Sequence, residues 1–212
     1  MTDNTPPQHE EEPVLGLRAR KKALTHRTIA EAAFELTVER GLDDVTIDQI
    51  ADRAFVSPRT VSNYFPSKEA AIVAAGDVAP VDLLAGLEER PADEAPLQSL
   101  REVLTSAIRS WSKEQLKSLK AKEQLVDANP ALLPHRTAQF DELEEAIHLV
   151  IAERTGADPE TAAFPRLIAG AATAAVKTAI KVWVNTNGGA DHIAEIVDQA
   201  FIDLEAGLSP DA

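Results

Sequence analysis

The stretch that decides the fold runs over residues 45–68, V-T-I-D-Q-I-A-D-R-A-F-V-S-P-R-T-V-S-N-Y-F-P-S-K. Within it, three residues predict the start of a helix. Thr46 followed by Gln49 has the spacing of a capping box, in which each side chain accepts a hydrogen bond from the backbone N–H of the other residue. Ser57, which a proline follows, predicts a second helix, and Ser67 predicts a third. Short helices separated by tight turns in this order are typical of a helix-turn-helix.

The second short helix, over residues 58–64, has too few apolar residues for an ordinary core helix. Val61 and Phe65 can face inward, whereas the other side chains are left to face outward. These are mainly Arg, Asn and hydroxyl side chains, which suit the phosphates and base edges of DNA. A short solvated surface helix is the simpler alternative. The residues that we expect to contact DNA, including the neighbouring helix starts, are Thr46, Ser57, Pro58, Arg59, Thr60, Ser62, Asn63, Tyr64 and Lys68.

Basic residues at two further places have the charge to bind the DNA backbone. Lys68 lies on the first turn of the third helix, where the helix dipole disfavours a cation. A phosphate docked there would be bound by the ammonium and by the free N–H groups of that turn. The run R-A-R-K-K over residues 18–22 opens the first long helix, expected at 17–40. Solvated surface charge is the alternative for both.

The stretch V-S-P-R-T-V-S-N-Y-F-P-S-K-E, residues 56–69, resembles the recognition helix of the TetR family of transcriptional regulators. The resemblance includes the Tyr-Phe pair that closes this helix and the Lys that opens the next one. Upstream, R-T-I-A-E-A-A-F-E-L-T-V-E-R-G-L-D-D-V-T is similar to the family's first helix and its Gly stop. The resemblance implies a DNA-binding domain over residues 17–80, with the helix-turn-helix at 45–64. It also implies a ligand-binding and dimerisation domain over 81–212.

One position departs from the family pattern. The turn between the two short helices usually carries Gly, and here Phe55 stands in its place. If Phe55 is left-handed, its side chain costs on the order of 1 kcal/mol there. The sequence therefore does not determine the angle of the recognition helix.

The composition favours an all-helical protein. Of the 212 residues, 44% are hydrophobic but only 4% are aromatic, so Ala, Leu, Val and Ile must build the core. Runs of alternating β-branched residues between turn pairs are missing, which argues against strands. We therefore predict an all-α fold, with an N-terminal three-helix helix-turn-helix domain and a larger C-terminal helical domain. Residues 1–16, which are acidic and contain three prolines, are predicted to be a disordered tail.

The formal charge of −14 is unusual for a DNA-binding protein, but it is unevenly distributed. Residues 13–76 carry nine Lys and Arg against eight Asp and Glu, whereas residues 77–212 carry twelve against twenty-three. The N-terminal domain is therefore the least acidic part of the chain. An acidic body repels DNA and can direct the basic face toward it.

Several classes of site have no counterpart in the sequence. There is no cysteine, which excludes disulfides and thiolate metal sites. The five histidines lack the spacing of a metal-binding pair, and no nucleotide-binding or nucleophile motif occurs. We thus expect no enzyme, no cofactor and no metal. Finding neither a signal peptide nor a long apolar run, we expect a soluble, cytoplasmic protein without a membrane partner.

The C-terminal half offers candidates for an effector site and for a dimer interface. The large groups that could line a pocket, although each could equally be core, are Trp111, Phe140, His148, Phe164, Lys177 and Trp183. The aliphatic composition favours an unknown, apolar effector. The resemblance implies that the helices expected at 159–186 and 191–206 pair with a second copy, with Ile196, Ala200 and Phe201 on one stripe. Packing within the monomer is the alternative.

These features together predict a DNA-binding transcriptional regulator, a ligand-responsive repressor that binds a palindromic operator as a homodimer. A helical interaction protein that has lost DNA binding is the main alternative, kept open by Phe55 and by the acidity.

Overall fold

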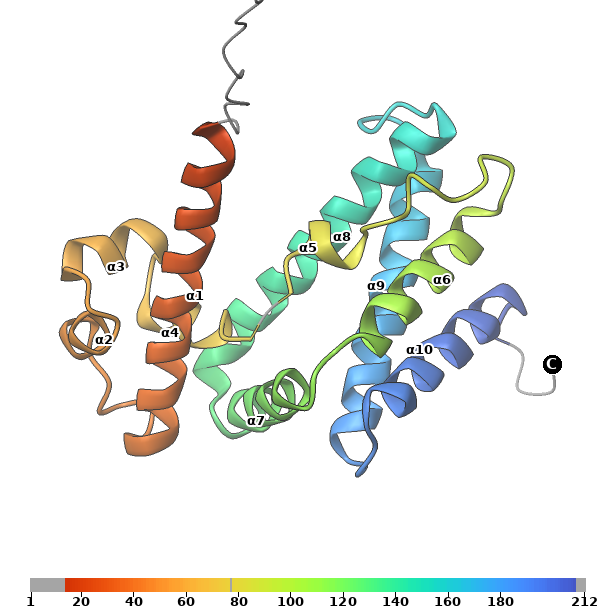
Figure 1. Cartoon of the computed structure of the whole chain (residues 1–212). Helices are drawn as coiled ribbons and strands as arrows, with labels where there is room; N and C mark the ends of the chain where they lie inside the picture. The colour runs from red at the N-terminus through yellow and green to blue at the C-terminus, as the bar shows by residue number, and fades with distance from the viewer. Residues whose placement is uncertain (1–13, 77, 209–212) are drawn as a thin grey trace, which may run out of the picture.

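The computed structural model describes residues 14–76 and 78–208, and these residues form helices without any strand (Figure 1). The all-α prediction is confirmed. The helices are α1 (Val14–Arg40), α2 (Ile47–Arg53), α3 (Pro58–Tyr64), α4 (Lys68–Val73), α5 (Pro80–Leu83), α6 (Pro96–Arg109), α7 (Lys113–Ala128), the 3-10 helix η1 (Pro130–Leu132), α8 (Leu133–Thr155), α9 (Ala163–Val184) and α10 (Ala190–Glu205).

The N-terminal domain consists of α1 to α4 around a small apolar core. The long helix α1 presents Ile29, Ala33 and Leu36 to that core, and Gly41, with a φ of 88°, ends it. Arg53 at the end of α2 binds Glu39 of α1 through two hydrogen bonds of 2.9 and 2.6 Å. This bond lowers the pKa of the Glu39 carboxyl. Residues 14–16, expected in the tail, belong to α1, and residues 1–13 lie outside the described part of the chain.

The C-terminal domain packs α6, α8, α9 and α10 around a second core, while α7 crosses toward the N-terminal domain (Figure 1). Helix α10 lies against α6 and α9. Its apolar stripe is therefore used inside the domain, and Phe201 is fully buried. The prediction that Phe201 lies in a dimer interface is wrong, because the core of its own domain already covers this ring. Ile196 and Ala200 are half-buried against the same core.

Two further helix boundaries, in addition to the start of α1, differ clearly from the sequence-based expectation. Helix α4, expected to reach residue 79, ends at Val73, and Gly76 follows with a φ of 69°. A Cβ at Gly76 would lie 2.5 Å from Ser118 Oγ of α7, so glycine allows this close approach. Helix α9 begins at Ala163 and not at 159, because the Asp158 carboxylate accepts from Glu160 N at 2.8 Å and closes a local turn instead.

The turn between α2 and α3 holds Phe55 in the left-handed region, with a φ of 54°. The backbone around it forms the two hydrogen bonds of a Schellman motif, from Val56 N to Ala51 O at 3.0 Å and from Phe55 N to Asp52 O at 3.3 Å. The ring itself is 96% exposed. The turn therefore keeps the geometry that glycine would give it, and α3 follows a regular helix end. The cost is backbone strain that no packing of the ring offsets.

Replacing Phe55 by glycine should stabilise the protein by about 0.5–1 kcal/mol. Relief of the left-handed strain, about 1–2 kcal/mol, exceeds the extra entropy that glycine gives the unfolded chain. Urea unfolding followed by circular dichroism measures the difference. Phe55→Ala is the matched control, since it removes the ring and keeps the Cβ, and its stability should stay near wild type. Equal stabilisation by both variants would show that the ring, and not the backbone, is responsible.

Candidate DNA-binding interface and its link to the C-terminal domain

Both short helices of the helix-turn-helix begin at the predicted caps. Thr46 Oγ1 accepts from Gln49 N at 3.3 Å, and Gln49 Oε1 accepts from Thr46 N at 3.0 Å, which completes the capping box. Ser57 Oγ accepts from Thr60 N at 3.1 Å, and Pro58 occupies the first helical position. These bonds satisfy backbone donors that a short helix would otherwise leave to water. Local interactions therefore set where α2 and α3 begin.

Helix α3 is anchored on one face and free on the other. Val61 is buried in the N-terminal core, and Phe65 at its end packs on the His26 ring of α1, with ring centroids 4.4 Å apart. Arg59, Ser62 and Asn63 are exposed, while Thr60 and Tyr64 are half-buried. The outward set predicted for DNA contact thus lies on a single polar face of α3. The role of each of these residues in DNA contact stays a prediction.

Lys68 has a structural role that the sequence did not indicate. Its Nζ donates to Leu42 O at 2.8 Å and to Val45 O at 2.9 Å, in the loop between α1 and α2. These carbonyls account for a cation on the first turn of α4, which had been the reason to expect a phosphate there. One N–H of the ammonium is left for any other partner. The phosphate contact of Lys68 stays a prediction, but the position of this cation at the start of α4 no longer supports it.

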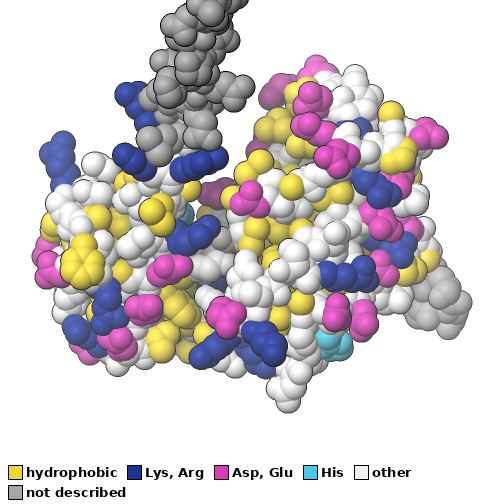
Figure 2. All heavy atoms as spheres, viewed as in Figure 1, with side chains coloured by type: hydrophobic (Ala, Val, Ile, Leu, Met, Phe, Trp, Pro, Cys, Tyr) yellow, Lys and Arg dark blue, Asp and Glu magenta, His cyan; other side chains and the backbone are white. Residues whose placement is uncertain are grey.

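The charge on the surface follows the division into domains. Arg18, Arg20, Lys21 and Lys22 are exposed on the first turns of α1. Figure 2 shows Lys and Arg side chains around this end of α1, and many Asp and Glu side chains on the opposite domain. The N-terminal domain therefore carries the face that is better suited to a polyanion.

The two domains share a core. Val126 of α7 and Leu132 of η1 are buried in the apolar cluster of the N-terminal domain, beside residues of α1 and α4. A set of hydrogen bonds joins the same elements. Gln139 Nε2 of α8 donates to Val73 O at the end of α4 at 3.1 Å. Arg136 donates to Gln139 Oε1 at 3.1 Å and, through Nε, to Glu123 Oε1 of α7 at 2.7 Å.

Arg136 and Glu123 are nearly buried, and the guanidinium lies 4.1 Å from the centroid of the Phe140 ring. Removing one partner of such a pair would leave an uncompensated charge in the domain junction. These contacts connect α7 and α8 to the end of α4, the helix that follows the helix-turn-helix. Sequence reasoning missed Arg136 and Gln139, because polar residues on an amphipathic helix usually face water.

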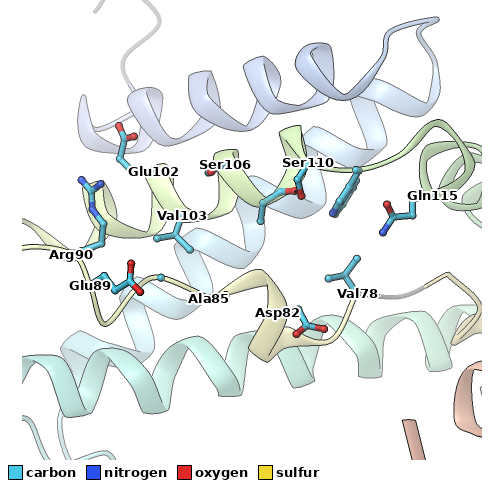
Figure 3. Close-up of a pocket in the computed structure, with 13 residues that line it drawn as sticks. Val78, Asp82, Ala85, Glu89, Arg90, Glu102, Val103, Ser106, Ser110 and Gln115 are labelled. Atoms are coloured by element: carbon cyan, nitrogen blue, oxygen red, sulfur yellow. Dashed lines mark hydrogen bonds between the residues drawn. The ribbon is translucent and has the colours of Figure 1, made fainter. Parts of the chain in front are cut away.

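The C-terminal domain has a cavity of about 620 Å³ between α5, the loop after it, α6 and the start of α7 (Figure 3). Of the six residues predicted to line an effector pocket, only Trp111 does so. Phe140 and Trp183 belong to the core, and Trp183 Nε1 donates to Gly188 O at 3.0 Å. Lys177 Nζ lies 5.5 Å from the centroid of the Phe140 ring, outside the cavity lining.

The remaining two predicted lining residues lie elsewhere. The side chain of His148 is 2% exposed, with Nδ1 3.5 Å from the Glu145 carboxylate, whereas Phe164 is half exposed on α9. The structure therefore does not gather the six residues in one pocket. The residues that do line the cavity include Asp82, Glu89 and Glu102, whose sequence context resembles an ordinary solvated surface.

Comparison with known proteins agrees with this architecture. Residues 29–75 match the family model of bacterial regulatory proteins of the tetR family, and residues 94–209 match the MftR C-terminal domain. The HTH-type transcriptional regulator TcmR of Streptomyces glaucescens is 30% identical over 203 residues, which cover 92% of this chain and 88% of TcmR. MftR of Mycobacterium tuberculosis is 23% identical over 190 residues, covering 89% of this chain and 93% of that protein.

Among solved structures, Salmonella enterica GusR has a TM-score of 0.50 at 18% identity, covering 94% of this chain and 98% of GusR, which supports the fold alone. The family rests on the sequence matches, which cover both domains. A capped helix-turn-helix with an outward polar helix, joined through a shared core to a larger helical domain, is the arrangement that those matches lead one to expect. The chain belongs to the TetR family of helix-turn-helix transcriptional regulators.

Proposed function

We propose that this regulator is a ligand-responsive repressor that binds a palindromic operator as a homodimer in the cytoplasm. The observation that carries the proposal is the polar outer face of α3, held by the Ser57 cap on one side and by Val61 and Phe65 on the other. A rigid helix with such a face suits insertion into the major groove. The acidic surface of the rest of the protein is repelled by the DNA phosphates, and this repulsion orients the polar face of α3 toward DNA.

Dimerisation is proposed to use the outer face of α9. This helix is long and apolar enough to cross a membrane, yet half of its apolar stretch is buried in the C-terminal domain. The earlier expectation of no long apolar run fails here. On the other face, Phe164, Leu167 and Val182 are 51%, 70% and 48% exposed. Exposed Ala174 lies between them, and small residues permit the close approach of two helices. A second copy of the chain would cover this stripe.

Control by an effector is proposed to act through the junction between the domains. The cavity is lined by Trp111 and Gln115 at the start of α7, and the same helix carries Glu123 and Val126 into the junction. An effector that shifts α7 would therefore move α4 and change the separation of the two recognition helices. Successive major grooves are about 34–36 Å apart, so a small change of separation disfavours DNA.

Arg59→Ala should weaken operator binding by about 1–3 kcal/mol, because Arg59 is exposed on the polar face and suits a bidentate contact to guanine or phosphate. The duplex is one obtained by selection of bound DNA from a random pool, and fluorescence anisotropy gives the affinity. Arg109→Ala, the same change at an exposed position at the end of α6, should bind as wild type. Wild-type affinity in Arg59→Ala would remove this residue from the interface.

Lys68→Ala should lower the free energy of unfolding by about 1.5–3 kcal/mol, because two carbonyls lose hydrogen bonds from a charged donor. The slope of log affinity against log salt concentration should stay unchanged at a temperature where the variant is folded. A slope that becomes shallower by about one unit would instead establish the phosphate contact.

Leu167→Glu should make the protein monomeric at micromolar concentration and weaken operator binding more than tenfold, since two buried like charges would face each other at the interface. The residue is exposed within one copy, so folding should be unaffected. Light scattering gives the mass and circular dichroism the helicity. Leu208→Glu, at another exposed leucine, is the control. A dimer of Leu167→Glu at the same concentration would place the interface on other helices.

A further inference from the structure

The first turns of helix α1 carry a block of positive charge and project beyond the other helices of the N-terminal domain (Figure 1). Between Val14 and Ala30 the sequence has no Asp or Glu, and its basic residues are Arg18, Arg20, Lys21, Lys22 and Arg27. All of these basic side chains are exposed, and none has a salt-bridge partner in the part of the chain that the structure describes. This end of α1 therefore lacks a counter-charge among the described residues.

This block of cations is unfavourable for the helix that carries it. Arg18 is three residues before Lys21 and four before Lys22, and residues at these spacings are neighbours on a helix surface. Like charges placed in this way repel each other and destabilise the helix. The free N–H groups of the first turn also attract an anion, and that turn contains no acidic residue. An anionic partner at this end of α1 would relieve the repulsion and satisfy these groups.

The same turns of α1 lie beside the helix that we expect to enter DNA. The ring of His26, four residues after Lys22, packs against the end of α3, with ring centroids 6.4 Å from Tyr64 and 4.4 Å from Phe65. Four residues of a helix correspond to about 6 Å along its axis. A duplex bound at α3 would therefore come close to the cations of α1. Any anionic group that covers these cations would compete with the phosphates of that duplex.

The residues directly before α1 carry the opposite charge. Residues 1–12 contain no Lys or Arg, and three of their four acidic residues form the run Glu10, Glu11 and Glu12. Glu10 precedes the start of α1 at Val14 by four residues, which span at most about 14 Å. Along the axis of α1, Lys22 lies about 12 Å from Val14. A chain that turns back at the start of α1 is therefore long enough to bring the acidic run (residues 10–12) to the basic start of α1 (residues 18–22).

From the unpaired cations of α1, the opposite charge of the acidic run and the length of chain between them, we infer that the acidic run docks on the basic start of α1 and competes there with the DNA backbone. The run lies outside the described residues, and its charge and reach carry the inference. It goes beyond the proposed function, because it requires DNA binding but neither an effector nor a dimer. Docking would lower the affinity for every duplex. Random sequence, which is bound through phosphates alone, would then be released while an operator with base contacts stays bound.

The affinity for a duplex of random sequence tests the competition. Neutralising the acidic run by Glu10→Gln, Glu11→Gln and Glu12→Gln together should tighten binding about tenfold at low salt, about 50 mM, since each exposed ion pair contributes about twofold. At about 200 mM salt the gain should fall below threefold, because the docked contact is itself screened. Fluorescence anisotropy measures both affinities. No gain at low salt, or a gain of the same size at both salt concentrations, would overturn the inference.

Because the whole protein is acidic, a control must separate the acidic run from the net charge. Glu88→Gln, Glu142→Gln and Glu153→Gln together make the same change of net charge at exposed positions of the C-terminal domain. This triple variant should tighten binding to the random duplex by less than twofold, because distant surface charges are largely screened. Equal gains in the two triple variants would assign the effect to net charge and overturn the docking site.

A second set of variants tests the partner of the acidic run. The basic start of α1 is neutralised by Arg18→Gln, Arg20→Gln, Lys21→Gln and Lys22→Gln together, which weakens DNA binding directly. In this background, neutralising the acidic run as well should change the affinity by less than twofold, because the run has lost its partner. A tenfold gain that persists in this background would show that the run acts elsewhere, and would overturn the inference.

The docked contact can also be measured without DNA, which separates failure of this inference from failure of DNA binding. The sequence has no cysteine, so Gln8→Cys gives a single site for a nitroxide label. The label should broaden the amide resonances of residues 18–22 at least twofold more in the otherwise wild-type chain than in the chain with the neutralised acidic run. A random duplex, where it binds, should remove this difference. Equal broadening in the two labelled chains would overturn the inference whether or not the protein binds DNA.

Discussion

The interaction on which the rest of the structure depends is the shared core at the junction of the two domains. Val126 and Leu132 belong to the larger domain in sequence, but they are buried with α1 and α4 of the DNA-binding domain. Without them, the short helix α4 would lose apolar neighbours from the larger domain. The hydrogen bond from Gln139 to Val73 O fixes the same end of α4. The end of α4 is thus held by both domains, which gives a physical connection between the helix-turn-helix domain and the larger domain.

Features that depend on residues close together in the chain could be predicted from the sequence, whereas features that depend on distant residues could not. The caps at Thr46 and Ser57 and the outward face of α3 were predictable, because they depend on neighbours within four residues. The conformation of Phe55 could not be decided from the sequence, and the structure shows that it is left-handed and that the Schellman hydrogen bonds keep the turn regular. Lys68 illustrates the opposite case, since its partners lie more than twenty residues away in the α1–α2 loop. The candidate cavity was mostly missed, because its lining residues come from α5, the loop after it, α6 and α7, and the sequence does not show that the fold brings these segments together.

The acidity of the chain affects both its DNA-binding surface and its C-terminal domain. Outside the N-terminal domain it disfavours nonspecific contact with DNA, so that the exposed face of α3 and the basic start of α1 become the surface of closest approach. Inside the C-terminal domain it places Asp82, Glu89 and Glu102 in the lining of the cavity.

Selection of bound duplexes from a random pool by the wild-type protein tests the central claim most directly, which is that two copies of α3 read DNA from a symmetric dimer. The selection should enrich an inverted repeat whose half-sites are centred about one helical turn, roughly 10 base pairs, or a multiple of it apart. Binding to that repeat should be salt-dependent and lost when either half-site is scrambled. A pool that shows no enriched motif, or an enriched single site without two-fold symmetry, would contradict the account.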